Sequence, residues 1–135
     1  MKDRRIWNQG MQSMFSSISR RYDLMNTLMT FGMDRRWRQR TVAMVELPPG
    51  GLLLDIGSGT GEIAIQTLRR NPCARIVAAD LTPAMMKMGI QKIGRKVFWC
   101  GSDAVMLPFR DGSFDGVTSG YLVRNVSDVH EAFRQ

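Results

Sequence analysis

The stretch that decides the fold is Asp55-Ile56-Gly57-Ser58-Gly59-Thr60-Gly61-Glu62. It contains the end of a short apolar run, Leu52–Ile56, which suits a buried strand, and a helical pattern extends from about Gly61 to Arg70. Glycines at alternate positions allow a tight turn and let a ligand approach the backbone. The stretch therefore predicts a strand, a glycine-rich turn that binds a ligand, and a helix.

Strand and helix patterns alternate after this turn. The further strands are expected at Arg75–Asp80, Lys96–Cys100 and Phe114–Ser119, and another helix is expected from Val126 to Gln135. Such alternation predicts parallel strands joined by right-handed crossovers. The fold class is therefore α/β, a Rossmann-like doubly wound parallel sheet with its ligand site at the carboxyl ends of the strands.

The region before Pro48-Pro49-Gly50-Gly51 is expected to be helical. Helical spacing runs from Trp7 to Ile18, and a second helix is expected over Asp34–Glu46, after Phe31-Gly32. We accordingly divide the chain into an N-terminal helical cap or substrate region, residues 1–48, and a ligand-binding core, residues 49–135.

The net charge of +7 is concentrated near the N-terminus, where residues 1–40 hold nine Lys and Arg against three Asp and Glu. A basic region of this kind can bind nucleic acid or anionic lipid. The interpretation we favour is an amphipathic helix with solvated arginines (Arg35, Arg36, Arg38, Arg40) and a buried stripe (Trp37, Thr41, Met44, Val45). Nucleic acid is not the expected partner, because the aromatic residues do not interleave with the arginines as a stacking surface requires.

Other chemistries are disfavoured by composition. Cys73 and Cys100 are far apart and are expected to be reduced thiols of a cytoplasmic protein, and the single His130 has no cysteine pair with which to bind zinc. No metal site is expected.

The spacing of the glycines separates two kinds of nucleotide ligand. The dinucleotide fingerprint is GxGxxG, whereas this turn reads GxGxG and is followed by Glu62. A carboxylate at the start of the helix would repel a pyrophosphate. S-adenosyl-L-methionine (SAM) suits the turn better, because it has no phosphate and carries a sulfonium and an ammonium group.

Carboxylates lie at or just after the ends of three of the expected strands. Asp80 is expected to accept hydrogen bonds from both ribose hydroxyls, with a helix N-cap as the alternative, and Asp103 is expected to accept from the adenine amino group, with an ordinary turn aspartate as the alternative. Asp55 and Glu62 can orient the ammonium group. Converging carboxylates in a basic chain favour a cationic ligand.

A more specific resemblance comes from motifs spread along the chain. Arg21-Tyr22-Asp23-Leu24-Met25-Asn26, Phe31-Gly32 and Arg35-Arg36-Trp37-Arg38 resemble the N-terminal signature of the ubiquinone/menaquinone-biosynthesis C-methyltransferase family. The resemblance continues in the same order through these further blocks: Gly59-Thr60-Gly61, Asp80, Met86-Lys87-Met88-Gly89, Leu107-Pro108-Phe109 and Arg124-Asn125-Val126. The family implies SAM-dependent methylation of a ring carbon on a polyprenylated quinol.

The resemblance also implies roles for individual residues. Arg124 is the candidate stabiliser of a phenolate, Asp23 a candidate base, and Tyr22 and Asn125 would line the acceptor pocket, although a helix-packing corner at Tyr22–Asn26 is nearly as good an interpretation. The expected cofactor-binding residues are Asp55, Gly57, Gly59, Thr60, Gly61, Asp80, Leu81, Asp103, Ala104 and Gly120.

Departures from the family pattern leave alternatives open. This chain has Gly57 where the family usually has Ala, Glu62 where it has Asp, Gly120 where it has Ser, and Leu122 at a glycine position. A different small acceptor, or a SAM-binding module without activity, therefore stays open. Related sheets have seven strands, so we expect a chain cut after its fourth strand, dimerisation through the open edge of that strand, and peripheral membrane contact through the basic N-terminal half.

Overall fold

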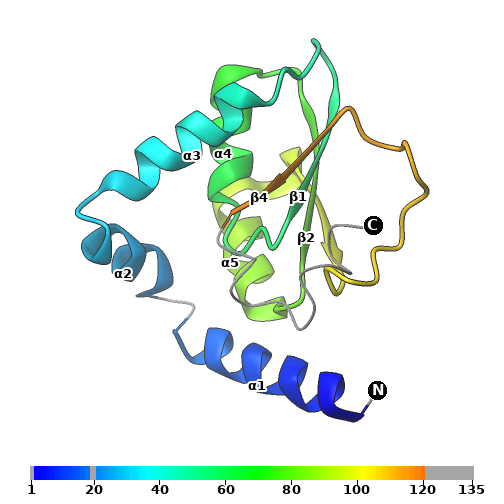
Figure 1. Cartoon of the computed structure of the whole chain (residues 1–135). Helices are drawn as coiled ribbons and strands as arrows, with labels where there is room; N and C mark the ends of the chain where they lie inside the picture. The colour runs from blue at the N-terminus through cyan, green and yellow to red at the C-terminus, as the bar shows by residue number, and fades with distance from the viewer. Residues whose placement is uncertain (1, 19–20, 121–135) are drawn as a thin grey trace.

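A computed structural model describes residues 2–18 and 21–120 of the chain (Figure 1). Helices α1 (Lys2–Ile18), α2 (Tyr22–Met29) and α3 (Met33–Met44) precede the sheet. The elements that follow are β1 (Leu52–Ile56), α4 (Glu62–Arg70), β2 (Arg75–Asp80), α5 (Pro83–Ile93), the short 3₁₀ helix η2 (Gly94–Lys96), β3 (Phe98–Gly101) and β4 (Gly116–Ser119).

The four described strands form one parallel sheet in the order β3-β2-β1-β4. Leu53 of β1 pairs with Ile76 of β2 on one side and with Gly116 of β4 on the other. The predicted α/β Rossmann-like sheet is confirmed, and β1 and β2 have the predicted bounds. Strands β3 and β4 each begin two residues later than predicted; Lys96 ends η2 instead.

Helices α3, α4 and α5 gather on one side of the sheet, and the connection from β3 to β4 passes on the other side without a helix (Figure 1). Small and branched apolar side chains form the core between sheet and helices: Leu53, Ala64, Ala74, Ile76, Ala78 and Val97. Val45 and Leu47, directly after α3, pack against this core and so attach the N-terminal helices to the sheet.

The indole ring of Trp99 connects β3 to α5 and to the glycine turn. A Cβ added at Gly89 would lie 2.0 Å from this ring, and one added at Gly61 would lie 2.8 Å from it. Both distances are far inside van der Waals contact, so a side chain at either position would displace the ring. Helix α5 therefore approaches β3 closely because residue 89 is glycine.

The face that α3 buries differs from the predicted one. Its buried residues are Asp34, Arg38 and Val42, whereas Trp37 is 44% and Met44 is 83% exposed. The assignment of Arg38 to the solvated side was wrong because the buried carboxylate of Asp34, one turn earlier, forms an ion pair with it.

Helix α2 was not predicted as a separate element. Its eight residues lack a buried apolar stripe, since Leu24, Leu28 and Met29 are exposed. The helix expected at Val126–Gln135 lies outside the described residues. None of the helices in the described ranges is long and apolar enough to cross a membrane.

Candidate functional site

The turn after β1 is held by its backbone. Gly57, Gly59 and Gly61 have positive φ angles of 67°, 54° and 82°, which side chains strongly disfavour. The N–H groups of Gly57 and Ser58 donate to the carbonyl of Ala79 at 2.8 and 3.1 Å. The alternating glycines thus serve the backbone conformation, and the turn is fastened to β2.

The carboxylate of Asp80 connects the glycine turn after β1 to the segment after β2. Its Oδ2 accepts from the Gly59 N–H at 2.7 Å, and its Oδ1 accepts from the Thr82 N–H, also at 2.7 Å. Burial raises the pKa of Asp80 above its ordinary value, and these N–H donors oppose the rise. Each carboxylate oxygen can accept a second hydrogen bond, so Asp80 keeps acceptor capacity for a ligand at the turn.

Asp55 is the most deeply buried carboxylate near the turn, with 1% of its surface exposed. Its Oδ1 accepts from the Thr118 Oγ1 at 2.9 Å, whereas its Oδ2 has no hydrogen-bond partner among the described residues. Burial raises the pKa of Asp55 to about 7, and the charge of Asp80 adds to the rise. At neutral pH the carboxyl group is therefore poised between its two protonation states.

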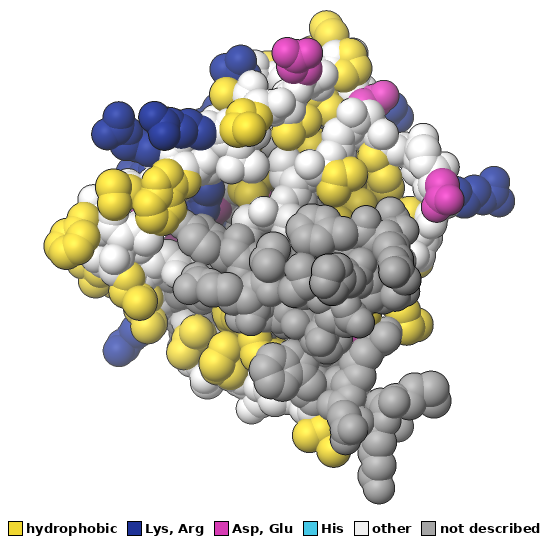
Figure 2. Space-filling model, viewed as in Figure 1, with side chains coloured by type: hydrophobic (Ala, Val, Ile, Leu, Met, Phe, Trp, Pro, Cys, Tyr) yellow, Lys and Arg dark blue, Asp and Glu magenta, His cyan; other side chains and the backbone are white. Residues whose placement is uncertain are grey.

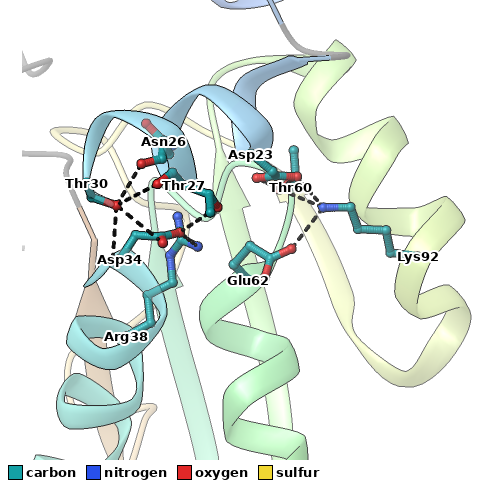
Figure 3. A network of polar contacts seen from close by, with 9 residues as sticks. All are labelled: Asp23, Asn26, Thr27, Thr30, Asp34, Arg38, Thr60, Glu62 and Lys92. Atoms are coloured by element: carbon teal, nitrogen blue, oxygen red, sulfur yellow. Dashed lines mark hydrogen bonds and ion pairs between the residues drawn. The ribbon is translucent and has the colours of Figure 1, made fainter. Parts of the chain in front are cut away.

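The Thr60 side chain of the turn meets side chains from three helices, which are Asp23 of α2, Glu62 of α4 and Lys92 of α5 (Figure 3). The Thr60 hydroxyl donates to the Asp23 carboxylate of α2, with its closer oxygen at 2.7 Å. The ammonium of Lys92 in α5 forms ion pairs with Asp23 and with Glu62, the latter at 2.9 Å. Burial alone lowers the pKa of Lys92, but hydrogen bonds to both carboxylates raise it overall. The lysine therefore neutralises two carboxylates of the site.

Lys92 is a site residue that sequence reasoning missed. It lies in the last turn of α5, where a lysine is an ordinary surface residue that suits the negative end of the helix dipole. No local pattern indicates that α5 returns to the glycine turn, so only the fold could reveal this contact.

A buried ion pair supports the site from the α2–α3 side (Figure 3). Arg38 donates to Asp34 Oδ2 at 2.8 Å, and the hydroxyls of Thr27 and Thr30 contact the same carboxylate at 3.4 Å. Arg38 also lines the small cavity at the glycine turn. It therefore brings a positive charge close to Asp55, whose pKa it lowers.

That cavity has a volume of about 30 Å³, the size of one water molecule. Its lining includes six predicted site residues: Asp23, Asp55, Gly57, Gly59, Thr60 and Gly120. A Cβ added at Gly59 would meet no atom within 4 Å, so the turn faces open space there. The oxygen Ser58 Oγ is buried without a partner in the described part of the chain. Unpartnered polar atoms around open space fit a polar ligand.

The remaining predicted residues follow β2 and β3 at the same edge of the sheet. The Leu81 carbonyl accepts from Gln12 of α1 at 2.8 Å, and Asp103 accepts from the Val105 N–H at 3.2 Å, beside buried Ala104. Tyr22 begins α2, although its side chain is outside the described part. Arg124 and Asn125 lie outside the described residues.

The described residues contain no cluster of three His, Cys, Asp or Glu side chains that could hold a metal ion. The charged groups at the turn are instead paired with lysine or arginine or hydrogen-bonded to hydroxyl and N–H donors. These groups lie at the carboxyl ends of parallel strands, where open α/β sheets generally bind their ligands.

Sequence comparisons support a specific relationship. The family model described as "ubiE/COQ5 methyltransferase family" matches residues 2–135. The demethylmenaquinone methyltransferase of Roseiflexus castenholzii is 44% identical over 125 residues, covering 92% of this chain and 52% of the relative. The ubiquinone/menaquinone biosynthesis C-methyltransferase UbiE of Desulfotalea psychrophila is 42% identical over 121 residues, covering 89% and 49%. The chain spans about half the length of the curated relatives it matches.

Solved structures support the fold. A putative SAM-dependent methyltransferase from Methanococcus maripaludis superposes with a TM-score of 0.73 at 21% identity, covering 88% of this chain and 56% of that one. The YcgJ protein from Bacillus subtilis superposes with a TM-score of 0.62 at 31% identity, covering 69% and 41%.

Proposed function

The chain belongs to the ubiE/COQ5 methyltransferase family, and from this premise we propose that it binds SAM at the glycine turn for methyl transfer to a ring carbon of a quinol-type acceptor. The observation that carries the proposal is the turn itself. It has three glycines with positive φ and faces open space at Gly59. The buried carboxylate of Asp55 and the partly buried carboxylate of Asp80 adjoin it.

The charges around the turn suit the parts of SAM. Asp55, with its unpartnered Oδ2, and Glu62 would hold the ammonium group, directly or through water. Asp80 would accept from the ribose hydroxyls. Arg38, a buried cation that lines the same cavity, suits the carboxylate of the amino-acid end. Arg38 was not among the cofactor-binding residues expected from sequence.

The other expected cofactor contacts follow from the same placement. Asp103 would accept from the adenine amino group, with Leu81 and Ala104 packing beside the base. Thr60 and Gly120 line the cavity. SAM supplies an electrophilic methyl group on its sulfonium when bound.

Room for the cofactor requires a rearrangement. A cavity of about 30 Å³ is roughly tenfold smaller than a typical small-molecule site. Asp23 of α2 lines the cavity and accepts from Thr60, and Lys92 of α5 forms an ion pair with Asp23. We propose that α2 moves away from Thr60 on binding, so that the helical region of residues 1–48 acts as a cap over the core of residues 49–135.

For the acceptor, the chemistry requires an ionised phenol, whose electron density makes the ring carbon nucleophilic. Asp23 is our candidate for taking the phenol proton, once α2 has moved. From the family resemblance alone, Arg124 remains the candidate stabiliser of the phenolate, and Tyr22 and Asn125 remain candidates for lining the acceptor pocket.

A lipophilic acceptor suits the exposed apolar surface of α2 and the turn after it. Leu24, Leu28, Met29 and Phe31 are exposed, the last at 93%. Figure 2 shows hydrophobic side chains at the left edge of the molecule, next to a group of Lys and Arg. We propose that this surface contacts the membrane in which a polyprenylated acceptor dissolves, with the protein peripheral on the cytoplasmic side.

The outer edge of β4 is the second candidate contact. Strand β4 ends the described sheet, so its outer backbone groups have no strand partner among the described residues. We propose that two copies pair through this edge. A purely monomeric sedimentation profile would exclude the pairing.

Calorimetric titration with SAM tests the cofactor site. We expect Asp80→Ala to abolish binding, because both its backbone contacts and its acceptor capacity disappear. Asp111→Ala, which removes the same charge from an exposed loop, should bind normally. Equal binding by the two variants would contradict the assignment.

Methyl transfer tests the acceptor. The chain is incubated with methyl-labelled SAM and a short-chain demethylmenaquinol, and the product is analysed by mass spectrometry. A labelled methyl group on the ring carbon supports the proposal. Binding without transfer would indicate a SAM-binding module, and transfer only to another phenol would replace the acceptor.

A further inference from the structure

A cleft between α3 and α4 is lined by arginine. Its volume is about 610 Å³, within the range of small-molecule sites. Arg36 and Arg40 reach it from α3, and Arg69 and Arg70 reach it from the last turn of α4. The lining contains no acidic residue. Figure 2 shows Lys and Arg side chains gathered on the upper left of the molecule, where α3 lies in Figure 1.

These arginines are unpaired in the part of the chain that the structure describes. The ion pairs found there join Arg38 to Asp34 and Lys92 to Asp23 and Glu62, and none involves a cleft arginine. The helix dipole accounts for Arg69 and Arg70, since cations are favourable near the carboxyl end of a helix. It does not account for two further arginines that face them from another helix, because like charges repel.

The cleft is separate from the glycine turn. No residue lines both the cleft and the small cavity at the turn. Helix α4 begins at Glu62, beside the turn, and the cleft lies along its later turns, at Gln66 and beyond. An occupant of the cleft would therefore not need to displace SAM.

We propose that the cleft binds the phosphate groups of an anionic ligand. Guanidinium groups bind phosphate oxygens with paired, charge-assisted hydrogen bonds, and four of them can engage a diphosphate or a phosphate ester together. The amides of Gln39 and Gln66, also in the lining, supply further neutral donors. The phosphate belongs either to a soluble molecule or to a phospholipid headgroup.

The test compares two double variants of the full chain. Arg36→Gln with Arg40→Gln removes two cleft charges. Arg95→Gln with Lys96→Gln removes two exposed charges from η2, outside the cleft, and is the matched control. Circular dichroism checks that each is folded, and SAM titration checks that the glycine turn is unaffected. The comparison of anion binding by the two variants tests the cleft even if SAM does not bind to the chain.

Two probes separate the two sources of phosphate: calorimetric titration with inorganic pyrophosphate at low ionic strength, and cosedimentation with phosphatidylglycerol or phosphatidylcholine vesicles. We expect the cleft variant to bind at least one anionic probe about tenfold more weakly than the control, or about 1.4 kcal/mol. Weaker binding of the cleft variant to pyrophosphate alone supports a soluble ligand. Weaker binding of the cleft variant to phosphatidylglycerol vesicles alone supports a phospholipid headgroup. Binding of neither probe, or equal weakening in both variants, overturns the proposal.

Discussion

Replacing Asp55 by Asn removes a carboxyl group whose ionised form is disfavoured by burial in the folded protein. Burial raises the pKa of Asp55 from 3.8 to about 7. The unfolded chain has the ordinary value, so between these two pH values the folded state holds a proton that the unfolded state has released. Stability therefore falls as pH rises through this window, and the Asn variant, which has no charge at any pH, escapes that loss.

The size of the effect follows from the shift. Each pKa unit corresponds to about 1.4 kcal/mol, so the whole shift amounts to about 4 kcal/mol. Between about pH 5 and pH 8 the wild type should lose about 3 kcal/mol relative to Asp55→Asn. The amide oxygen can still accept from Thr118, which preserves the one hydrogen bond that the side chain makes.

Urea unfolding at the two pH values, monitored by tryptophan fluorescence, measures this difference. Comparing wild type with variant cancels the shared titrating groups that do not interact with Asp55, so that Asp55 and its coupling to Asp80 account for the difference. Asp111→Asn, in an exposed loop, is the control and should show no such trend. A stability difference between wild type and Asp55→Asn that is the same at both pH values would refute the reasoning. The stabilised variant should also bind SAM less tightly, because it cannot offer a negative charge to the ammonium group.

Three further substitutions, the first with a matched control, test packing and charge. Gly89→Ala should destabilise the protein by about 2 kcal/mol, because the added methyl group would collide with the Trp99 ring. The control Gly10→Ala lies in open space on α1 and should stabilise the protein by up to about 1 kcal/mol. Equal effects of the two variants in thermal unfolding would contradict the packing argument. Asp34→Ala should cost about 3–5 kcal/mol, because it leaves a buried guanidinium without its partner, and a loss under 1 kcal/mol in urea unfolding would argue against it. Lys92→Met should change stability by under about 1 kcal/mol, since its ion pairs are partly exposed, yet tighten SAM binding by releasing two carboxylates; weaker binding in calorimetry would count against this role.

Much of the sheet is predictable because its strands are short apolar runs closed by glycine, proline or aspartate. β1 and β2 lie within the sheet, and their bounds match the prediction. The edge strands β3 and β4 were predicted too long, because Lys96 and Phe114 continue the pattern although the backbone pairs only from residues 98 and 116 onwards.

The N-terminal half was harder to predict because its interior is polar. Arg38 looks like a surface residue in any periodicity argument, and only the carboxylate of Asp34 makes its burial favourable. Lys92 reaches Asp23 across 69 positions of sequence, so no local window contains the contact. The glycine turn, by contrast, was predictable because its chemistry and its backbone conformation belong to the same few residues.

The order of the strands also governs how the protein can assemble during synthesis. Leu53 meets Ile76 of β2 after 23 positions but meets Gly116 of β4 only after 63. Closing the longer loop costs about 0.9 kcal/mol more in chain entropy. As the chain leaves the ribosome, β1, β2 and β3 can associate before β4 emerges. Until then β1, the future centre of the sheet, is itself an edge, and the nascent chain passes through a stage in which its most apolar strand is open to aggregation.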